Sequence, residues 1–315
     1  NVNLYNGTGT GRIYRICATD AAPPNWTKGL KLGDASDEQL VEKLNDKNIW
    51  WRLNSQRLLV DRNSDKALPA LIRMAQNPKE PMGRLHALWT LEGMNELTSD
   101  LIVNAMKDPL PGIRENAIRL AELHLTMDPE LDTSLLTLQD DTDAKVRFQL
   151  LCTLGYINTP ESDQVRQQLL FKDIDDKWVQ IAALSATSSQ SVSLLNAVLQ
   201  KFDPSVKAYE SLVQLLGGII GKSQNTAIIQ GFLQKAVTSD KQSTWQAPLI
   251  EGLAQGLENR TSLPKDLWQE RNLLIKASLE DSSNSIRQSS LHLLKVIGLP
   301  EGAQTNVAMS KAIKM

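Results

Sequence analysis

A recurring pair of one aspartate and one arginine constrains the fold of this 315-residue chain more than any other feature. In four segments an acidic or polar turn precedes an amphipathic run, and the arginine follows the aspartate by six residues. The pairs are Asp46 and Arg52, Asp108 and Arg114, Asp141 and Arg147, and Asp281 and Arg287. Two further copies carry Arg84, one residue later in its turn, and Gln180 at the arginine position.

The copies from Arg52 to Gln180 recur every 30 to 33 residues, and each contains two helical patterns. A period of this length with two helices per unit is typical of an α-solenoid. In the third copy an apolar stripe at helical spacing needs a neighbouring helix to cover it. It consists of Ile113, Ala117, Leu120 and Ala121. Segments 203–216 and 244–257 have the character of divergent second helices.

After residue 30 no segment alternates apolar and polar residues as a half-buried strand does. We therefore predict an all-α fold. The expected architecture is an α-solenoid (α-α superhelix) of about eight repeats, preceded by a short extended N-terminal segment.

The pattern of aspartate, turn, apolar residue and arginine, with a small residue three positions later, resembles HEAT repeats over residues 34–298. The small residues are Ser55, Ala117 and Ser290. The resemblance implies that the aspartates and arginines pair along the stack as a structural ladder. The predicted ladder comprises Asp46, Arg52, Arg84, Asp108, Arg114, Asp141, Arg147, Asp281 and Arg287. Recurrence favours a structural role, because a stacking group is needed in every repeat whereas a catalytic group is needed once.

The segment GGIIGKS at residues 217–223 is close to a phosphate-binding loop of the form G-x-x-x-x-G-K-[ST]. Leu216 occupies the position of the required first glycine, and an apolar helical run precedes the segment in place of a strand. We predict instead a helix that ends in a glycine-rich C-cap, with Ser223 or Asn225 starting the next helix.

The segment GTGTG at residues 7–11 also lacks the G-x-G-x-x-G spacing of a dinucleotide-binding turn. The β-branched and aromatic stretch that follows it is typical of a strand. This segment is interpreted as a turn that leads into a strand.

The sequence shows no local arrangement of catalytic or metal-binding residues. His86, His124 and His292 each lack a second His or Cys three or four positions away, so none forms a local metal pair. His124 continues the apolar stripe and is expected to be partly buried at a helix end. Acidic pairs in turns, such as Asp140 and Asp141, are expected to cap helices. We expect no enzyme, no catalytic or metal-binding residue and no cofactor.

Alignment on the arginines separates two kinds of tryptophan. Trp51 takes the apolar position that Ile113 fills in another copy, which favours packing. Trp50 and Trp178 share a position that is polar or small in other copies, and Trp89 lies at another such position. Large aromatic residues at normally polar positions are candidates for partner binding. The alternative is that each covers a neighbouring loop or ridge.

The charge balance argues against nucleic acid as a partner. The formal net charge is −2, with 34 basic and 36 acidic residues. Such a chain lacks the positive field that steers a protein onto nucleic acid. No apolar run approaches the roughly 20 residues that span a bilayer. We expect a soluble protein without direct membrane insertion.

The first residues and the first repeat together resemble a larger architecture. GRIYRI at residues 11–16 precedes a proline-containing connector, and a Trp-Arg-x-x-x-Gln-Arg-Leu-Leu element follows at residues 51–59. This order resembles bacterial membrane-bound dehydrogenase-like proteins, in which a sugar-dehydrogenase-type β-propeller precedes HEAT repeats and often a c-type cytochrome domain. The resemblance implies a periplasmic or cell-envelope location. A C-x-x-C-H haem-attachment sequence is absent from this chain.

These observations predict three parts. Residues 1–33 form an extended remnant of a preceding β-propeller plus linker, residues 34–298 form the solenoid, and residues 299–315 form a cap or the start of a truncated repeat. The expected function is a non-catalytic scaffold that binds proteins or neighbouring domains of a larger exported dehydrogenase-like protein. One alternative is a free-standing HEAT-repeat adaptor. Another is an enzyme of this fold, such as a DNA glycosylase or a bilin lyase.

Overall fold

The computed structural model describes residues 31–77, 79–185, 188–223, 225–238, 244–258, 267–281 and 283–299. These residues contain sixteen α-helices and no β-strand. The predicted all-α class and solenoid architecture are confirmed for this part of the chain. The number of repeats stays a prediction. The segments predicted as a propeller remnant and as a C-terminal cap lie, except for residues 31–33 and 299, outside the described residues.

The helices follow one another along the chain and contact one another in successive pairs, such as α1 with α2, α3 with α4 and α5 with α6. They are α1 (Asp37–Lys43), α2 (Ile49–Arg62), α3 (Leu68–Ala75), α4 (Pro81–Gly93), α5 (Ser99–Ala105), α6 (Pro111–His124), α7 (Glu130–Leu136), α8 (Ala144–Thr153), α9 (Pro160–Lys172), α10 (Lys177–Leu184), α11 (Ser188–Gln200), α12 (Lys207–Ser223), α13 (Thr226–Thr238), α14 (Gln246–Leu257), α15 (Trp268–Glu280) and α16 (Asn284–Ile297). Three short 3₁₀-helices join them, at Leu32–Asp34, Asp65–Ala67 and Leu154–Tyr156.

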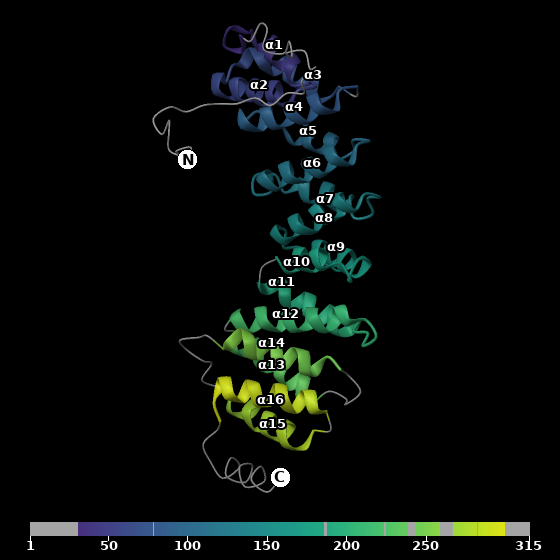
Figure 1. Ribbon diagram of the computed structural model, residues 1–315, viewed down its shortest axis with the longest axis vertical. Helices are drawn as coiled ribbons and strands as arrows, with labels where there is room; N and C mark the ends of the chain where they lie inside the picture. Colours follow the sequence, from purple (N-terminus) through teal and green to yellow (C-terminus); the bar gives the residue numbers. More distant parts are fainter. Residues whose placement is uncertain are drawn as a thin grey trace, which may run out of the picture.

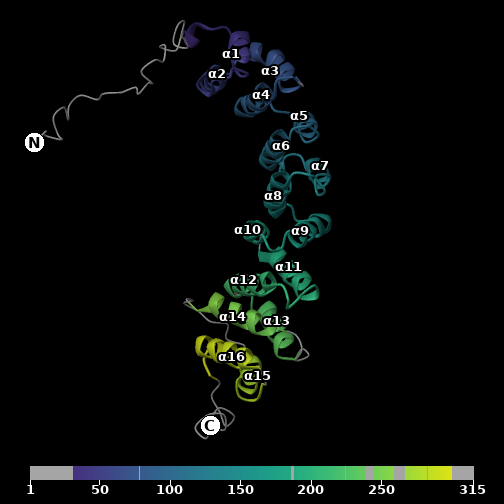
Figure 2. The same cartoon turned by 45° about the vertical axis from the view of Figure 1, so that its right-hand side comes forward.

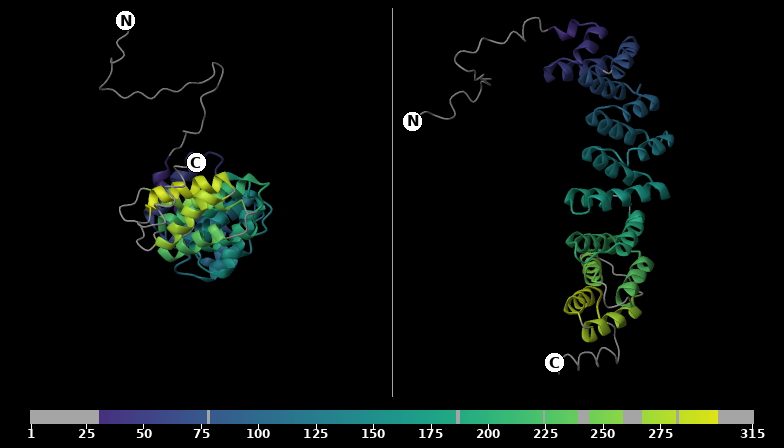
Figure 3. Two further views of the ribbon diagram at one scale, coloured as in Figure 1. Left: turned by 90° about the horizontal axis from the view of Figure 1, so that it is seen from below. Right: turned by 90° about the vertical axis from the view of Figure 1, so that its right-hand side faces the viewer.

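The pairs stack along one long axis, from α1 and α2 at one end to α15 and α16 at the other (Figure 1). The stack is a shallow arc with the even-numbered helices on its inner side and the odd-numbered helices on its outer side (Figure 2). Viewed along the axis, the pairs overlap in one compact projection (Figure 3, left). Successive pairs are in contact along the stack, for example α2 with α4, α4 with α6 and α6 with α8, and such nearest-neighbour packing is the defining property of a solenoid. The predicted second helices in segments 203–216 and 244–257 are α12 and α14.

Short polar side chains and prolines set the starts of the even-numbered helices. Asn48 accepts the Trp50 amide, Asp176 accepts the Trp178 amide, and Asp143 accepts the amides of two residues in the first turn of α8. These side chains satisfy donors that the first turn of a helix leaves without a partner. Helices α4 and α6 begin instead with proline, whose missing amide costs nothing there.

A continuous apolar core runs through the stack. The stripe predicted from Ile113, Ala117, Leu120 and Ala121 is fully buried. Leu101 and Ile102 of the partner helix α5 are buried as well. The core therefore extends from pair to pair as a solenoid requires, because one helix pair alone leaves its apolar face uncovered.

Helices α12 and α14 make an unusually close contact through glycines spaced four residues apart on each helix. A Cβ atom added to Gly217 would lie 2.9 Å from the Leu249 carbonyl oxygen, and one added to Gly221 would lie 2.8 Å from the Leu253 carbonyl oxygen. On α14, a Cβ atom at Gly252 would overlap the backbone of Gln214. The glycines therefore allow the two helix backbones to touch, a role known for small residues at helix interfaces.

This contact corrects the interpretation of GGIIGKS. The segment was expected to be a glycine-rich C-cap, but α12 continues through all of its glycines and ends at Ser223. The glycines lie inside the helix because α14 occupies the space that side chains would need. Asn225 starts the next helix, since its side chain accepts the Ile228 amide at 3.3 Å.

A buried arginine connects helices α9 and α11. Arg166 of α9 is 1% exposed and donates to the side-chain oxygen and the carbonyl oxygen of Gln190 in α11, at 2.9 and 3.0 Å. The Gln190 amide donates in turn to the Ile157 carbonyl at 2.7 Å. The two Nη atoms thus find acceptors, which reduces the cost of burying the guanidinium, although its Nε atom has no hydrogen-bond partner. This network therefore fixes α11 against α9.

Replacement of Gly252 by alanine is expected to lower the free energy of unfolding by about 1–3 kcal/mol, the usual cost of overpacking. The physical reason is the clash between the new Cβ atom and the Gln214 backbone. Urea unfolding followed by circular dichroism measures the change. Gly231→Ala on α13 is the matched control, because a Cβ atom there has nothing within 4 Å. That variant should gain about 0.5–1 kcal/mol from helix propensity. Equal changes in the two variants would contradict the close-contact role.

Candidate protein-interaction surface

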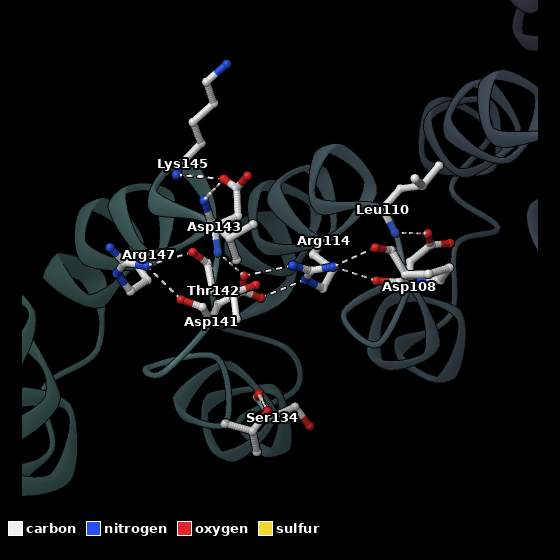
Figure 4. A network of polar contacts seen from close by, with 12 residues as sticks. Asp108, Leu110, Arg114, Ser134, Asp141, Thr142, Asp143, Lys145 and Arg147 are labelled. Carbon is white, nitrogen blue, oxygen red and sulfur yellow. Dashed lines mark hydrogen bonds and ion pairs between the residues drawn. The ribbon is translucent and has the colours of Figure 1, made fainter.

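Each arginine of the predicted ladder donates hydrogen bonds to backbone carbonyls of the turn that precedes it. The Nη1 atom of Arg114 donates to the carbonyl oxygens of Asp108 and Pro109 at 2.8 and 3.2 Å (Figure 4). Arg147 makes the same two bonds six and five residues back, to Asp141 and Thr142. Arg52 and Arg287 donate likewise to the carbonyl six residues back, at 2.7 Å. The spacing of six residues therefore places a guanidinium over carbonyls at the end of the preceding helix and turn, where acceptors lack helical partners.

The other edge of the guanidinium reaches the aspartate of the next repeat. Arg84 binds Asp108 with contacts of 2.8 and 3.0 Å, and Arg114 binds Asp141 with two bonds of 2.7 Å. Arg147 contacts Asp173 once, at 3.4 Å. These three ion pairs are called the ladder below. They connect successive even-numbered helices, since a bidentate arginine–carboxylate pair fixes both distance and orientation.

The ladder aspartates also shape their turns. One carboxylate oxygen of Asp108 accepts the Leu110 amide at 2.9 Å, and one of Asp141 accepts the Asp143 amide at 2.9 Å. Asp46 and Asp281 make the equivalent bond two residues on. The structure thus brings together each predicted Asp and Arg pair through a backbone carbonyl. The carboxylates of Asp108 and Asp141 pair instead with the arginine of the preceding repeat, and that of Asp46 pairs with Lys43 at 3.1 Å.

Arg52 has a different partner because the second repeat carries Asn77 where an aspartate would stand. The Nε atom of Arg52 donates to Nε2 of His86 at 3.1 Å, and Nδ1 of His86 lies 2.7 Å from Gln56 Oε1. Burial lowers the pKa of His86, and the charge of Arg52 lowers it further. A neutral His86 that accepts from Arg52 and donates to Gln56 satisfies all of these contacts.

In two copies the polar residue of the turn stands seven residues before the arginine position, not six. Arg84 donates to the Asn77 carbonyl, seven residues back. The Nε2 atom of Gln180 donates to the Ile174 carbonyl six residues back, at 2.7 Å. Gln180 therefore replaces the hydrogen bond of the arginine without its charge. Asp173, which sequence analysis did not single out, precedes Gln180 by seven residues, as Asn77 precedes Arg84.

The pair Arg114 and Asp141 is nearly buried, with side chains 13% and 6% exposed. The hydrogen bonds from Arg114 hold the pKa of Asp141 below its usual range, although burial acts in the opposite direction. The same hydrogen bonds raise the pKa of Arg114. Both groups therefore stay charged, and each compensates the other for the loss of water.

The three candidate tryptophans are in different environments. Trp50 is 39% exposed in the first turn of α2, where its ring meets Trp51 edge-on at 5.2 Å. Trp178 is 68% exposed in the first turn of α10. Trp89 is partly buried on α4 and donates its indole N–H to Asn116 of α6 at 3.0 Å. Trp50 and Trp178 thus offer free ring surface, whereas Trp89 connects two repeats.

Trp89 belongs to a second set of polar contacts between even-numbered helices. Arg119 of α6 donates to Gln149 of α8 at 2.9 Å. His124, expected to be partly buried at a helix end, is the last residue of α6 and lies 2.6 Å from Glu92. The partners are 27 to 32 residues apart in sequence. A search for polar residues that recur at the repeat spacing could have found this set.

Large apolar side chains remain exposed at the N-terminal ends of several even-numbered helices. This exposed row consists of Ile49, Trp50 and Leu53 in α2, Met82 in α4, Leu110 before α6, and Trp178 and Ile181 in α10. All follow the turns that join each odd-numbered helix to the next even-numbered one. We call this side of the stack the turn edge. The ladder and the exposed row share it.

Among the described residues, no three His, Cys, Asp or Glu side chains group as metal ligands would. Within the same ranges, no helix has both the length and the apolar character that a membrane span requires. No protein-family model matches the chain, and no curated protein matches it.

Removal of one ladder partner is expected to destabilise the stack strongly. Arg114→Gln leaves Asp141 buried without its cation, which should cost about 3–5 kcal/mol of unfolding free energy. Urea unfolding measures this. The control is Arg57→Gln, which removes the exposed pair with Asp61, where Arg57 is 77% exposed. That pair should contribute less than about 1 kcal/mol. A comparable loss in both variants would contradict the ladder's structural role.

The ladder also predicts a dependence on pH. Because Arg114 lowers the folded-state pKa of Asp141, the ionised carboxylate stabilises the fold above its unfolded pKa of about 3.9. This stabilisation is lost as the pH falls through the lower, folded-state pKa. The stability difference between the natural protein and Asp141→Asn should therefore be large at neutral pH and shrink in strong acid. Urea midpoints for both proteins across this range measure it. A difference that does not change with pH would contradict this assignment.

Proposed function

We propose that the chain is a non-catalytic scaffold that binds a partner protein along its turn edge. The observation that carries the proposal is the exposed row, above all Trp50 and Trp178. Exposed large aromatics are unfavourable in water unless a partner covers them, and tryptophan is enriched among the residues that dominate binding energy.

The architecture supports this proposal in a second way. A solenoid presents a long surface on which side chains from several repeats can contact one partner. The exposed row includes residues from α2 to α10. The ladder beside it holds neighbouring repeats at a fixed spacing, so a partner would meet a preformed surface and lose less entropy on binding.

The proposal includes HEAT repeats as the repeat type, supported by the recurring aspartate and arginine. It extends to a larger exported dehydrogenase-like protein, in which the partner is a neighbouring domain or a separate protein. Residues 11–16, on which part of that resemblance rests, lie outside the described residues. Upstream β-propeller repeats in the open reading frame would support the extension, and an unrelated upstream sequence would favour a free-standing adaptor.

The experiment compares the natural chain with Trp50→Ala/Trp178→Ala in affinity capture and quantitative mass spectrometry. The dissociation constant of each purified partner is then measured by calorimetry. Loss of both rings should weaken binding by about tenfold or more, as expected for residues of this kind. Leu215→Ala on α12, 49% exposed and outside the row, is the control and should change the constant less than about twofold. Equal binding by all three chains, or redox turnover with sugar and a quinone cofactor, would contradict the proposal.

The two kinds of tryptophan should differ in stability. Trp178→Ala is expected to change the unfolding free energy by less than about 0.5 kcal/mol, because the ring is mostly exposed. Trp89→Ala should cost about 1–3 kcal/mol, since it removes packing and the bond to Asn116. Thermal or urea unfolding measures both. A large loss for Trp178→Ala would assign that ring to packing and remove it from the proposed surface.

A further inference from the structure

An open cleft of about 680 Å³ lies at the turn edge between α8 and α10. Its lining includes the apolar side chains of Phe148 in α8, Phe171 in α9 and Val179 in α10. Arg147 and the exposed side chains of Lys145 and Lys172 line it as well. A cleft of this size and lining can take one large side chain together with adjoining backbone.

The equivalent cleft between α4 and α6 shows what is unusual here. It has a volume of about 380 Å³ and is lined by Arg84, Asp108 and Ile113. There the arginine and the aspartate approach to 2.8 Å, and both side chains are less than 10% exposed. The cleft at α8 and α10 is larger where the ladder contact is longer, at 3.4 Å, and where Asp173 is 45% exposed.

Arg147 can therefore bind a further anion through the edge of its guanidinium that carries Nη2 and Nε. Its Nη1 atom is bound to backbone carbonyls, and Nη2 makes the long contact with Asp173. Its buried Nε atom has no hydrogen-bond partner. Nε of Arg84 has none either but lies 2.8 Å from a carboxylate oxygen of Asp108, and Nε of Arg114 donates to Asp141 at 2.7 Å. A buried donor without a partner is unfavourable, and a carboxylate is the acceptor whose shape fits a guanidinium edge.

Both acidic and basic side chains surround the cleft. The hydrogen bonds that they already make decide which of them can contact a ligand. Asp176 accepts the Trp178 amide at the start of α10, and Asp173 holds Arg147 loosely. Asp175 is exposed at the rim. Lys145 and Lys172 are also exposed. An incoming carboxylate would meet Arg147 and the lysines once Asp173 turns away into water.

We propose that this cleft binds a partner segment in which an acidic residue stands next to an aromatic or large aliphatic residue. The carboxylate displaces Asp173 and binds Nε and Nη2 of Arg147. The apolar side chain packs against Phe148 and Phe171, which line the cleft. The proposal rests on the proposed function and names the chemistry that the scaffold recognises.

The test begins with a random twelve-residue peptide library displayed on phage and selected on the full chain. Enriched peptides should carry Asp or Glu within two positions of Phe, Tyr, Trp or Leu. Synthetic copies are measured by fluorescence anisotropy beside copies with the acid changed to its amide. The amide copies should bind about tenfold or more weakly, the effect of losing a charge-assisted hydrogen bond.

Variants of the chain locate the site. Asp173→Asn should tighten binding of the acidic peptides by about threefold or more, because it removes the anion that competes for Arg147. Asp175→Asn removes the same charge from the rim without freeing Arg147 and should change binding less than about twofold. Arg147→Gln should abolish the preference for acid over amide, with circular dichroism as the check that the variant is folded. If Arg147→Gln unfolds, the two aspartate variants still decide the question.

Several results would overturn the proposal. These are selection without acidic residues, failure to select any peptide, or equal tightening by Asp173→Asn and Asp175→Asn. Peptides that lose affinity with Trp50→Ala but not with the cleft variants would overturn this inference and leave the proposed function standing. Failure of the proposed function would instead be seen when the exposed-row variants bind every purified partner as the natural chain does.

Discussion

The ion pair between an arginine of one repeat and an aspartate of the next is the contact on which the described stack between α4 and α10 most depends. The guanidinium binds the carbonyls of its own turn and the carboxylate of the following turn. The same carboxylate accepts an amide within its own turn. One residue type at one spacing therefore closes a turn, starts a helix and joins two repeats. Loss of either partner leaves several polar groups buried at once.

The contacts between even-numbered helices at the inner face differ in kind between the two halves of the stack. From α4 to α10 the even-numbered helices are linked by charged and polar side chains. Between α12 and α14 the backbones themselves touch, and glycines make this possible. Gln180 ends the ladder because it keeps the hydrogen bond and brings no charge. The buried contact of Arg166 with Gln190 then holds the junction on the outer side.

Sequence reasoning reached the fold class because the recurring arginine and aspartate are visible in the chain itself. It placed Arg114 and Asp108 together but could not show that the carboxylate partner of Arg114 is Asp141, because that depends on how repeats stack. It assigned GGIIGKS to a helix end, since the need for glycine lies on α14, far away in sequence. Trp50, Trp89 and Trp178 looked alike in alignment, and only their three-dimensional neighbours separate the bridging ring from the exposed ones.

The ladder also has a direction, and this matters for a chain that a ribosome makes from its first residue onward. The aspartate partner of each arginine is synthesised after it, because it stands 24 to 27 residues later in the sequence. At ordinary rates of synthesis, about 1–5 s pass between the synthesis of the arginine and that of its aspartate. During this time the newest repeat presents a cation and an uncovered apolar face. Every repeat from α4 to α8 is thus completed by its successor, so the stack would consolidate vectorially, one helix pair behind the point of synthesis.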